Sequence, residues 1–167
     1  MLPRHNAYGG WPASGEIDIV ESRGNRDFVV GGQQIGSQLA GCTLHWGPDY
    51  FTNRYEYTHW ETRNSAGFDN DFHIYEMLWT PDSITFYIDG NQAGHVQPPA
   101  GGFWELGNLG ATGWGNPWRY SPSPMAPFDQ EFYFLINNAV GGVAYFPDGG
   151  YNGDGPKPWA NPSGRVR

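Results

Sequence analysis

The clearest alternation of apolar and polar residues in the chain runs from Gly15 to Ser22, in the segment Gly-Glu-Ile-Asp-Ile-Val-Glu-Ser. A period of two with β-branched residues predicts a strand that has one apolar and one polar face. Glu16 and Asp18 then share the polar face, whereas Glu21 would point to the opposite side of a regular strand. A β-bulge after Asp18 would return Glu21 to the polar face, and such bulges are common next to active sites. We therefore predict a bulged strand with three carboxylates on one face.

Other alternating or apolar segments predict further strands. They cover residues 28–30, 38–46, 55–60, 71–79, 83–89, 92–96 and 130–140. Residues 97–130 are rich in proline and glycine and predict an ordered loop region with room for a short helix. After residue 142 we expect loop to the end of the chain. Many short strands, Gly- and Pro-rich turns and no amphipathic helix predict an all-β sandwich.

Composition narrows the possible partners. The chain has 167 residues, of which 17% are aromatic and eight are tryptophan, and its net charge is −8. An acidic chain without basic patches favours neither nucleic acid nor anionic membranes, so we expect no nucleic-acid or membrane partner. Cys42 is the only cysteine, which excludes an intrachain disulfide and a Cys-based metal site. No apolar run is long enough for a transmembrane helix.

The spacing of the acidic residues suggests acid–base chemistry. With the bulge, the Cα atoms of Glu16 and Glu21 stand roughly 13 Å apart. Side chains that lean together can bring the carboxyl groups to about 5 Å, the separation found in retaining glycosidases. Asp18 between them can hold the nucleophile and separate the two pKa values. A solvated strand face or part of a cation site would also fit, although adjacent like charges are unfavourable in a strand.

The wider sequence resembles glycoside hydrolase family 16. The motif Trp-Pro-Ala-Ser-Gly at residues 11–15, followed by Glu16-x-Asp18-x-x-Glu21, is similar to the active-site strand of that family. Further similar segments are Leu2-Pro3-Arg4-His5-Asn6, Glu21-Ser22-Arg23-Gly24-Asn25, Leu44-His45-Trp46-Gly47-Pro48, Trp79-Thr80-Pro81-Asp82, Tyr87-Ile88-Asp89-Gly90 and Ala139-Val140-Gly141-Gly142. Within the family, the chain resembles endo-1,3-β-glucanases (laminarinases) and their invertebrate relatives, the β-1,3-glucan-binding or Gram-negative-bacteria-binding proteins.

This resemblance implies a fold and an activity. It implies a partial concanavalin-like jelly-roll β-sandwich and retaining endo-hydrolysis of 1,3-β-glucosidic linkages in glucans such as laminarin. Glu16 would be the nucleophile, Glu21 the general acid/base and Asp18 the supporting acid, with no metal and no cofactor. The three-residue step from Asp18 to Glu21 is the form that goes with 1,3-β-glucanases in this family. The alternative is a non-catalytic β-1,3-glucan recognition protein of innate immunity, but such members have typically lost the carboxylates that are all present here.

Three further residues are candidate substrate contacts. Trp11 precedes the acidic strand closely, so its indole could stack on a sugar ring, although a buried Trp under a loop fits as well. A lone histidine is usually structural, but the resemblance implies that His45 contacts the sugar on the leaving-group side. Trp46 could stack on the same side, and a place in the core is an equal alternative.

The resemblance also bears on the extent of the domain. Family relatives are longer, so we expect residues 1–167 to form a single family 16-like catalytic domain that is truncated at both ends. We expect the parent protein to be secreted and extracellular, with the signal peptide outside this chain. Its polysaccharide partner would be β-1,3-glucan, and the sequence predicts no particular oligomeric state.

Overall fold

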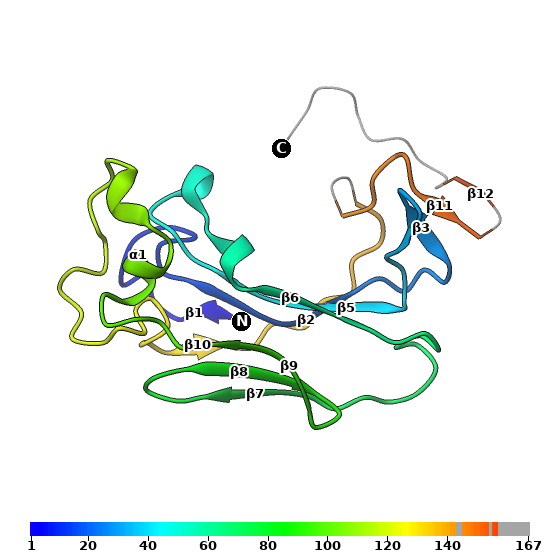
Figure 1. Cartoon of the computed structure of the whole chain (residues 1–167), viewed down its shortest axis with the longest axis horizontal. Coiled ribbons are helices and arrows are strands. Elements are labelled where there is room, and N and C mark those ends of the chain that lie inside the picture. Colours follow the sequence, from blue (N-terminus) through cyan, green and yellow to red (C-terminus); the bar gives the residue numbers. More distant parts are fainter. Residues whose placement is uncertain (143–144, 154, 157–167) are drawn as a thin grey trace. The chain divides into compact units, whose positions relative to one another are not determined.

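The computed structural model describes residues 1–142, 145–153 and 155–156, and β-strands make up most of its regular structure (Figure 1). The strands are β1 (Leu2–Pro3), β2 (Glu16–Ser22), β3 (Phe28–Val30), β4 (Gln33–Gln34), β5 (Leu39–His45), β6 (His59–Arg63), β7 (Tyr75–Trp79), β8 (Ile84–Ile88), β9 (Asn91–Val96), β10 (Phe132–Tyr133), β11 (Tyr151–Asn152) and β12 (Gly155–Pro156). The helices are α1 (Gly102–Leu106) and three short 3₁₀ turns, η1 (Tyr50–Thr52), η2 (Tyr55–Tyr57) and η3 (Leu109–Ala111). Among the described residues, none of these helices has the length and apolar character needed to span a bilayer.

The strands form four sheets. Their orders are β1-β10, β12-β11-β3-β4, β2-β5-β6 and β7-β8-β9. β7 and β8 form the predicted antiparallel hairpin, with Tyr75 opposite Ile88 and Trp79 opposite Ile84. β9 pairs antiparallel with β8, and the register shifts between Phe86 and Tyr87 of β8. The all-β class expected for a jelly-roll protein is therefore confirmed.

The chain divides into two compact units. The first comprises Met1–Glu21, Gly41–Glu61 and His73–Leu135, and it contains β1, β7–β10, α1 and most of β2, β5 and β6. The second comprises Ser22–Ala40, Thr62–Phe72 and the residues from Ile136 onward, and it contains β3, β4, β11 and β12. In the second unit Phe28 is buried against Phe146, with ring centroids 6.0 Å apart. All candidate site residues belong to the first unit.

The core of the first unit is aromatic and aliphatic. Ile17, Leu44 and Phe103 are completely buried, and each such side chain contributes about 1.5–3 kcal/mol relative to exposure. In β5, Cys42 and Leu44 lie in this core, while His45, one position further along, lies on the other face and is only partly buried. The strand thus attaches the histidine to a rigid layer.

Several predicted segments differ from the structure. Residues 55–60 contain the turn η2 before β6 begins at His59, and only Phe132–Tyr133 of the predicted strand 130–140 is paired. A strand exists only where a neighbour supplies hydrogen bonds, and β1 offers two residues to β10. Apolar side chains beyond this pairing, such as Ile136 at 98% exposure, have no layer to cover them within the described residues. In the tail predicted as loop, β11 and β12 form two short strands.

Candidate active site

The acidic strand β2 is anchored by its apolar face. Ile17 is completely buried, while Glu16 and Asp18 on either side of it are only partly buried and share the other face. The strand follows Gly15, which has a φ of +84°. A Cβ at Gly15 would lie 3.0 Å from the ring of Phe128, so the chain enters β2 where only glycine fits comfortably. Core packing therefore fixes the place from which the first two carboxylates project.

Glu21 lies near the end of β2, three residues after Asp18. In a regular strand it would share the face of Ile17, yet it is exposed, and the charges of Asp18 and Glu16 both act on it. Val20 and Ser22 on either side of it are exposed as well, so exposure does not assign Glu21 to a face and the predicted bulge stays a prediction.

Glu16 receives a direct hydrogen bond from Trp11. The indole Nε1–H donates to Glu16 Oε2 over 2.5 Å. The Trp11 side chain is 41% exposed, and its ring lies 5.6 Å from the ring of His45 and 5.7 Å from that of Tyr50. Trp11 is thus partly open to a ligand while its polar edge holds Glu16.

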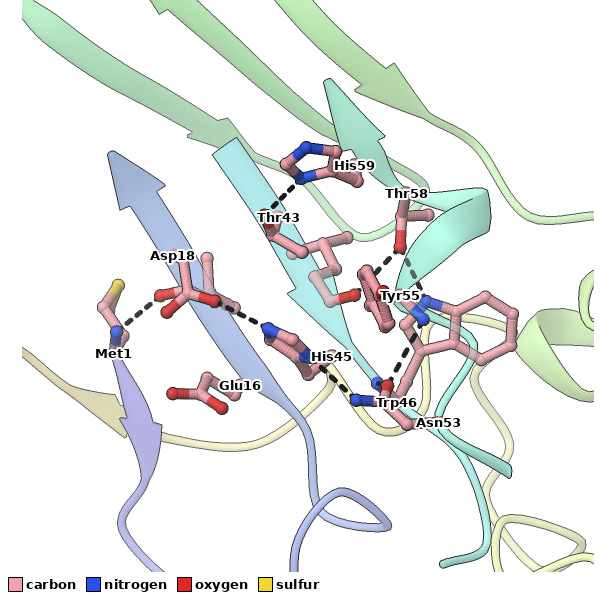
Figure 2. Close-up of polar contacts among 12 residues, drawn as sticks. Met1, Glu16, Asp18, Thr43, His45, Trp46, Asn53, Tyr55, Thr58 and His59 are labelled. Atoms are coloured by element: carbon pink, nitrogen blue, oxygen red, sulfur yellow. Dashed lines mark hydrogen bonds and ion pairs between the residues drawn. The ribbon is translucent and has the colours of Figure 1, made fainter. Parts of the chain in front are cut away.

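His45 lies between Asp18 and Asn53 (Figure 2). Its Nε2 is 3.3 Å from Asp18 Oδ2, and its Nδ1 is 2.8 Å from Asn53 Nδ2. The Tyr55 ring lies 5.4 Å from the imidazole. Both nitrogens of the imidazole therefore have fixed partners, and one of these partners is a member of the acidic row.

A tight loop returns Asn53 to the end of β5. Gly47 has a φ of +153°, and a Cβ there would lie 2.2 Å from the carbonyl oxygen of Thr52. Asp49 Oδ1 caps the following turn by accepting from the backbone N–H of Thr52 at 2.9 Å. This short connection allows Asn53 to reach back to His45.

An open cavity of about 540 Å³ borders Glu16. Trp11 and Glu16 form part of its wall together with Arg4, Asn6 and Tyr133. The lining combines two charged groups, hydrogen-bonding side chains and aromatic rings.

Trp46 does not belong to this surface. The side chain is completely buried, its Nε1–H donates to Thr58 Oγ1 at 2.8 Å, and its ring packs edge-on against Phe103. It continues the core face of β5, two residues beyond Leu44. The suggestion that Trp46 stacks on substrate is therefore wrong, and the core alternative describes its place.

Residues 6–100 match the family model described as glycosyl hydrolases family 16, which is more than half of the chain. The matched segment includes the whole acidic strand and His45. The chain belongs to glycosyl hydrolase family 16.

Relatives in this family carry two kinds of name. A β-1,3-glucan-binding protein of Penaeus monodon is 47% identical over 163 residues, which is 96% of this chain and 42% of that protein. A glucan endo-1,3-β-glucosidase of Cryptopygus antarcticus is 35% identical over 144 residues, which is 85% of this chain and 43% of that protein. The solved laminarinase from Rhodothermus marinus is 26% identical with a TM-score of 0.46, covering 77% of this chain and 41% of that one. The chain spans less than half of each of these proteins.

Two carboxyl groups on β2 have raised pKa values. Burial raises the pKa of Glu16, and the charge of Asp18 raises it further, whereas the hydrogen bond from Trp11 and the charge of His45 lower it. Burial and the charge of Asp18 likewise raise the pKa of Glu21. Glu21 has no hydrogen-bond donor among the described residues, so only Glu16 has a direct contact that favours its ionised form.

The same row of acids acts on His45. Burial alone would lower the pKa of His45, but the hydrogen bond with Asp18 and the charges of Asp18, Glu16 and Glu21 outweigh it and raise the pKa. The imidazole and the carboxylates are therefore electrically coupled, so that the charge of one changes the proton affinity of the others.

The site contains one grouping that could hold a cation. Ligand atoms of Glu16, Asp18 and His45 lie within 4.8 Å of one another in the described part of the chain. Glu16 already accepts from Trp11, and both nitrogens of His45 face partners. Hydrogen bonds thus account for this arrangement, and the expectation that the site needs no metal stays a prediction.

Sequence patterns did not indicate Asn53 or Tyr55. Asn53 follows the turn η1 and Tyr55 begins the turn η2, and in such short turns no periodicity shows which side chain points back toward the strand. The tight Gly47-Pro48 turn was visible in the sequence, but its hydrogen-bond partners were not.

Proposed function

We propose that the protein containing this chain is a retaining endo-hydrolase of 1,3-β-glucosidic linkages in β-glucans such as laminarin. The observation that carries the proposal is the arrangement on β2 of a family 16 chain. Glu16 is held by the indole of Trp11, and Asp18 adds its charge to both Glu16 and Glu21. A carboxyl group with a hydrogen-bond donor and a second one without a donor, whose pKa is raised, suit a nucleophile and a general acid.

The proposed reaction proceeds in two displacements. Glu16 attacks the anomeric carbon while Glu21 gives its proton to the departing glucosidic oxygen, which leaves a glucosyl ester on Glu16. Glu21, now ionised, takes a proton from water as that water attacks the anomeric carbon and releases Glu16. Asp18 lies beside Glu16 on β2, where its 3.3 Å contact with His45 Nε2 orients it.

Substrate contacts are proposed at Trp11 and His45. Trp11 presents an exposed ring beside the cavity that borders Glu16, so an apolar sugar face can stack on it. His45 lies 5.6 Å from the Trp11 ring on the adjoining strand. The glucan substrate and the names of the relatives favour an extracellular site of action, which we propose for the full-length protein.

A second function is favoured by the relatives' names. The 47% identical protein from Penaeus monodon is named for binding β-1,3-glucan and not for cleaving it. A recognition protein would use the same cavity without turnover. Retention of Glu16, Asp18 and Glu21 in one coupled cluster supports the hydrolase over this alternative.

The deciding experiment compares substrates with the full-length protein. We expect reducing ends to be released from laminarin, more slowly from mixed-linkage glucan, and hardly at all from pure β-1,4-glucan. The first product seen by ¹H NMR should have the β-configuration, because two displacements retain stereochemistry. Glucan binding without any product would establish the recognition function instead, and faster cleavage of β-1,4-glucan would contradict the proposed linkage.

Removing the indole donor should change the pH profile. In Trp11→Phe the aromatic ring remains, but Glu16 loses the hydrogen bond that favours its carboxylate. The pKa of Glu16, already raised by burial, should rise further, so the nucleophile becomes ionised only at higher pH. We expect the acidic limb of kcat/KM on laminarin to move to higher pH.

Trp114→Phe is the matched control. Trp114 is 50% exposed and lies in the loop after η3, so the same substitution there should leave the acidic limb in place. An unchanged limb in Trp11→Phe would show that the indole N–H does not stabilise the nucleophile.

A further inference from the structure

The imidazole of His45 can carry its proton on either nitrogen, and its surroundings distinguish the two. Asp18 Oδ2 faces Nε2 at 3.3 Å, and Asn53 Nδ2 faces Nδ1 at 2.8 Å. An ionised carboxylate only accepts hydrogen bonds, whereas a side-chain amide has one accepting and one donating end. The orientation of the Asn53 amide therefore decides which tautomer fits.

Two backbone amides fix the orientation of Asn53. Its Oδ1 accepts from the backbone N–H of Trp46 at 3.3 Å and from that of Tyr55 at 3.2 Å. Rotating the amide by half a turn would place its NH₂ group against these two donors and lose both hydrogen bonds. The NH₂ group is consequently the end that faces His45, and it donates to Nδ1.

An imidazole nitrogen that accepts a hydrogen bond carries no proton. We propose that Asn53 is a positioning residue that fixes His45 as the neutral tautomer with its proton on Nε2, from which His45 donates to Asp18. The chain Asn53–His45–Asp18 is visible in Figure 2, with His45 in the middle. Second partners of this kind commonly set the tautomer of functional histidines.

The functional benefit of this tautomer rests on the proposed hydrolase. The assignment of the tautomer itself does not. The charge of a protonated His45 would lower the pKa of Glu16 and Glu21 alike. Lowering the pKa of Glu21 would deplete the protonated form that a general acid needs. A neutral His45 can orient Asp18 without this penalty.

The carboxylates around His45 favour its protonated form over the neutral one. From β2, Asp18, Glu16 and Glu21 all raise the pKa of His45, while the neighbouring rings of Trp11 and Tyr55 bring no charge. The N–H of Asn53 works in the opposite direction, because protonation at Nδ1 would set two donors against each other. Asn53 thus opposes the charging of His45 that the acids favour.

The substitution Asn53→Asp tests the proposed role of Asn53, because it replaces only the amide NH₂ group with an oxygen. The aspartate keeps an oxygen for the two backbone amides but replaces the donor to His45 with an acceptor. We expect Nδ1 to become protonated and the pKa of His45 to rise by about one unit or more, as for an ion pair in contact. The measurement is long-range ¹H–¹⁵N correlation of ¹⁵N-histidine-labelled full-length protein across pH, with the His45 signals assigned by their loss in His45→Gln.

Asn64→Asp is the matched control. Asn64 also accepts from a backbone amide, that of Ala66 at 3.0 Å, so the substitution adds the same charge in a similar turn. We expect the His45 signals of Asn64→Asp to match those of the unmodified protein. Identical His45 signals in Asn53→Asp and Asn64→Asp would overturn the proposal.

The unmodified protein provides a test that needs no variant. At pH values below the pKa of His45 both ring nitrogens are protonated. At pH values above it we expect only Nε2 to keep its proton. Finding the proton on Nδ1 would refute the role of Asn53 even if Asn53→Asp did not fold. None of these spectra depends on turnover. If the protein bound laminarin without cleaving it, the proposed hydrolase would be contradicted, and the NMR spectra would still decide the tautomer of His45.

Discussion

Replacing Glu16 with alanine should abolish hydrolysis of laminarin while leaving the polysaccharide bound. The proposed mechanism has no first displacement without this carboxylate, so we expect turnover to fall by about 10⁴-fold or more, the scale seen when a nucleophile is removed from other enzymes. Binding should persist because the exposed Trp11 ring and the rest of the cavity wall remain. Reducing-end release and affinity electrophoresis in laminarin, both on the full-length protein, measure the two properties separately.

The matched control is Glu76→Ala, which removes an exposed glutamate from β7. Its turnover should equal that of the unmodified protein. Substantial activity remaining in Glu16→Ala would remove Glu16 from the role of nucleophile.

The role of Glu21 is separated from that of Glu16 by chemical rescue. In Glu21→Ala, azide can attack the glucosyl ester on Glu16 without a general base, and the product should be a β-glucosyl azide. An α-configured azide would instead indicate a single displacement and contradict the retaining mechanism.

Truncation of Trp46 to alanine should produce the largest loss of stability. The side chain is completely buried, and it contacts Phe103 and donates to Thr58. Replacing a buried aromatic residue with alanine costs about 3–5 kcal/mol, and a typical domain has only about 5–15 kcal/mol of stability in total. Urea denaturation followed by circular dichroism should therefore show a much lower midpoint for Trp46→Ala.

Trp114→Ala serves as the comparison, since its side chain is 50% exposed. We expect its free energy of unfolding to change by roughly 0.5 kcal/mol or less. If Trp46→Ala kept native stability and instead lost laminarin binding, the core assignment of Trp46 would have to be abandoned.

Alternating or continuous apolar runs along the chain predicted β2, β5 and the β7–β8 hairpin, because their apolar side chains pack into the core of the first unit. The same reasoning could have placed Trp46. It has the parity of Cys42 and Leu44, so continuing the pattern by one step puts its indole in the core. His45 differs from it by one position and consequently faces the site.

Other features depend on contacts between distant segments. The apolar run after Tyr133 reads as a strand, but pairing ends after two residues because β1 is only that long. Asn53 is similarly hidden, since its importance comes from two backbone amides and an imidazole that a loop brings together. Sequence periodicity describes faces of regular elements and carries no information about such loop contacts.

Cys42 lies on the same strand as His45, and its chemical modification can report how often that strand opens. Burial raises the pKa of this thiol to about 12, so it is almost wholly in its unreactive form at neutral pH. A thiol reagent can modify it only during the brief intervals when β5 separates from the core. The rate at which a thiol reagent labels this single cysteine under native conditions therefore measures how often β5 opens. Each opening also disrupts the Asn53–His45–Asp18 arrangement.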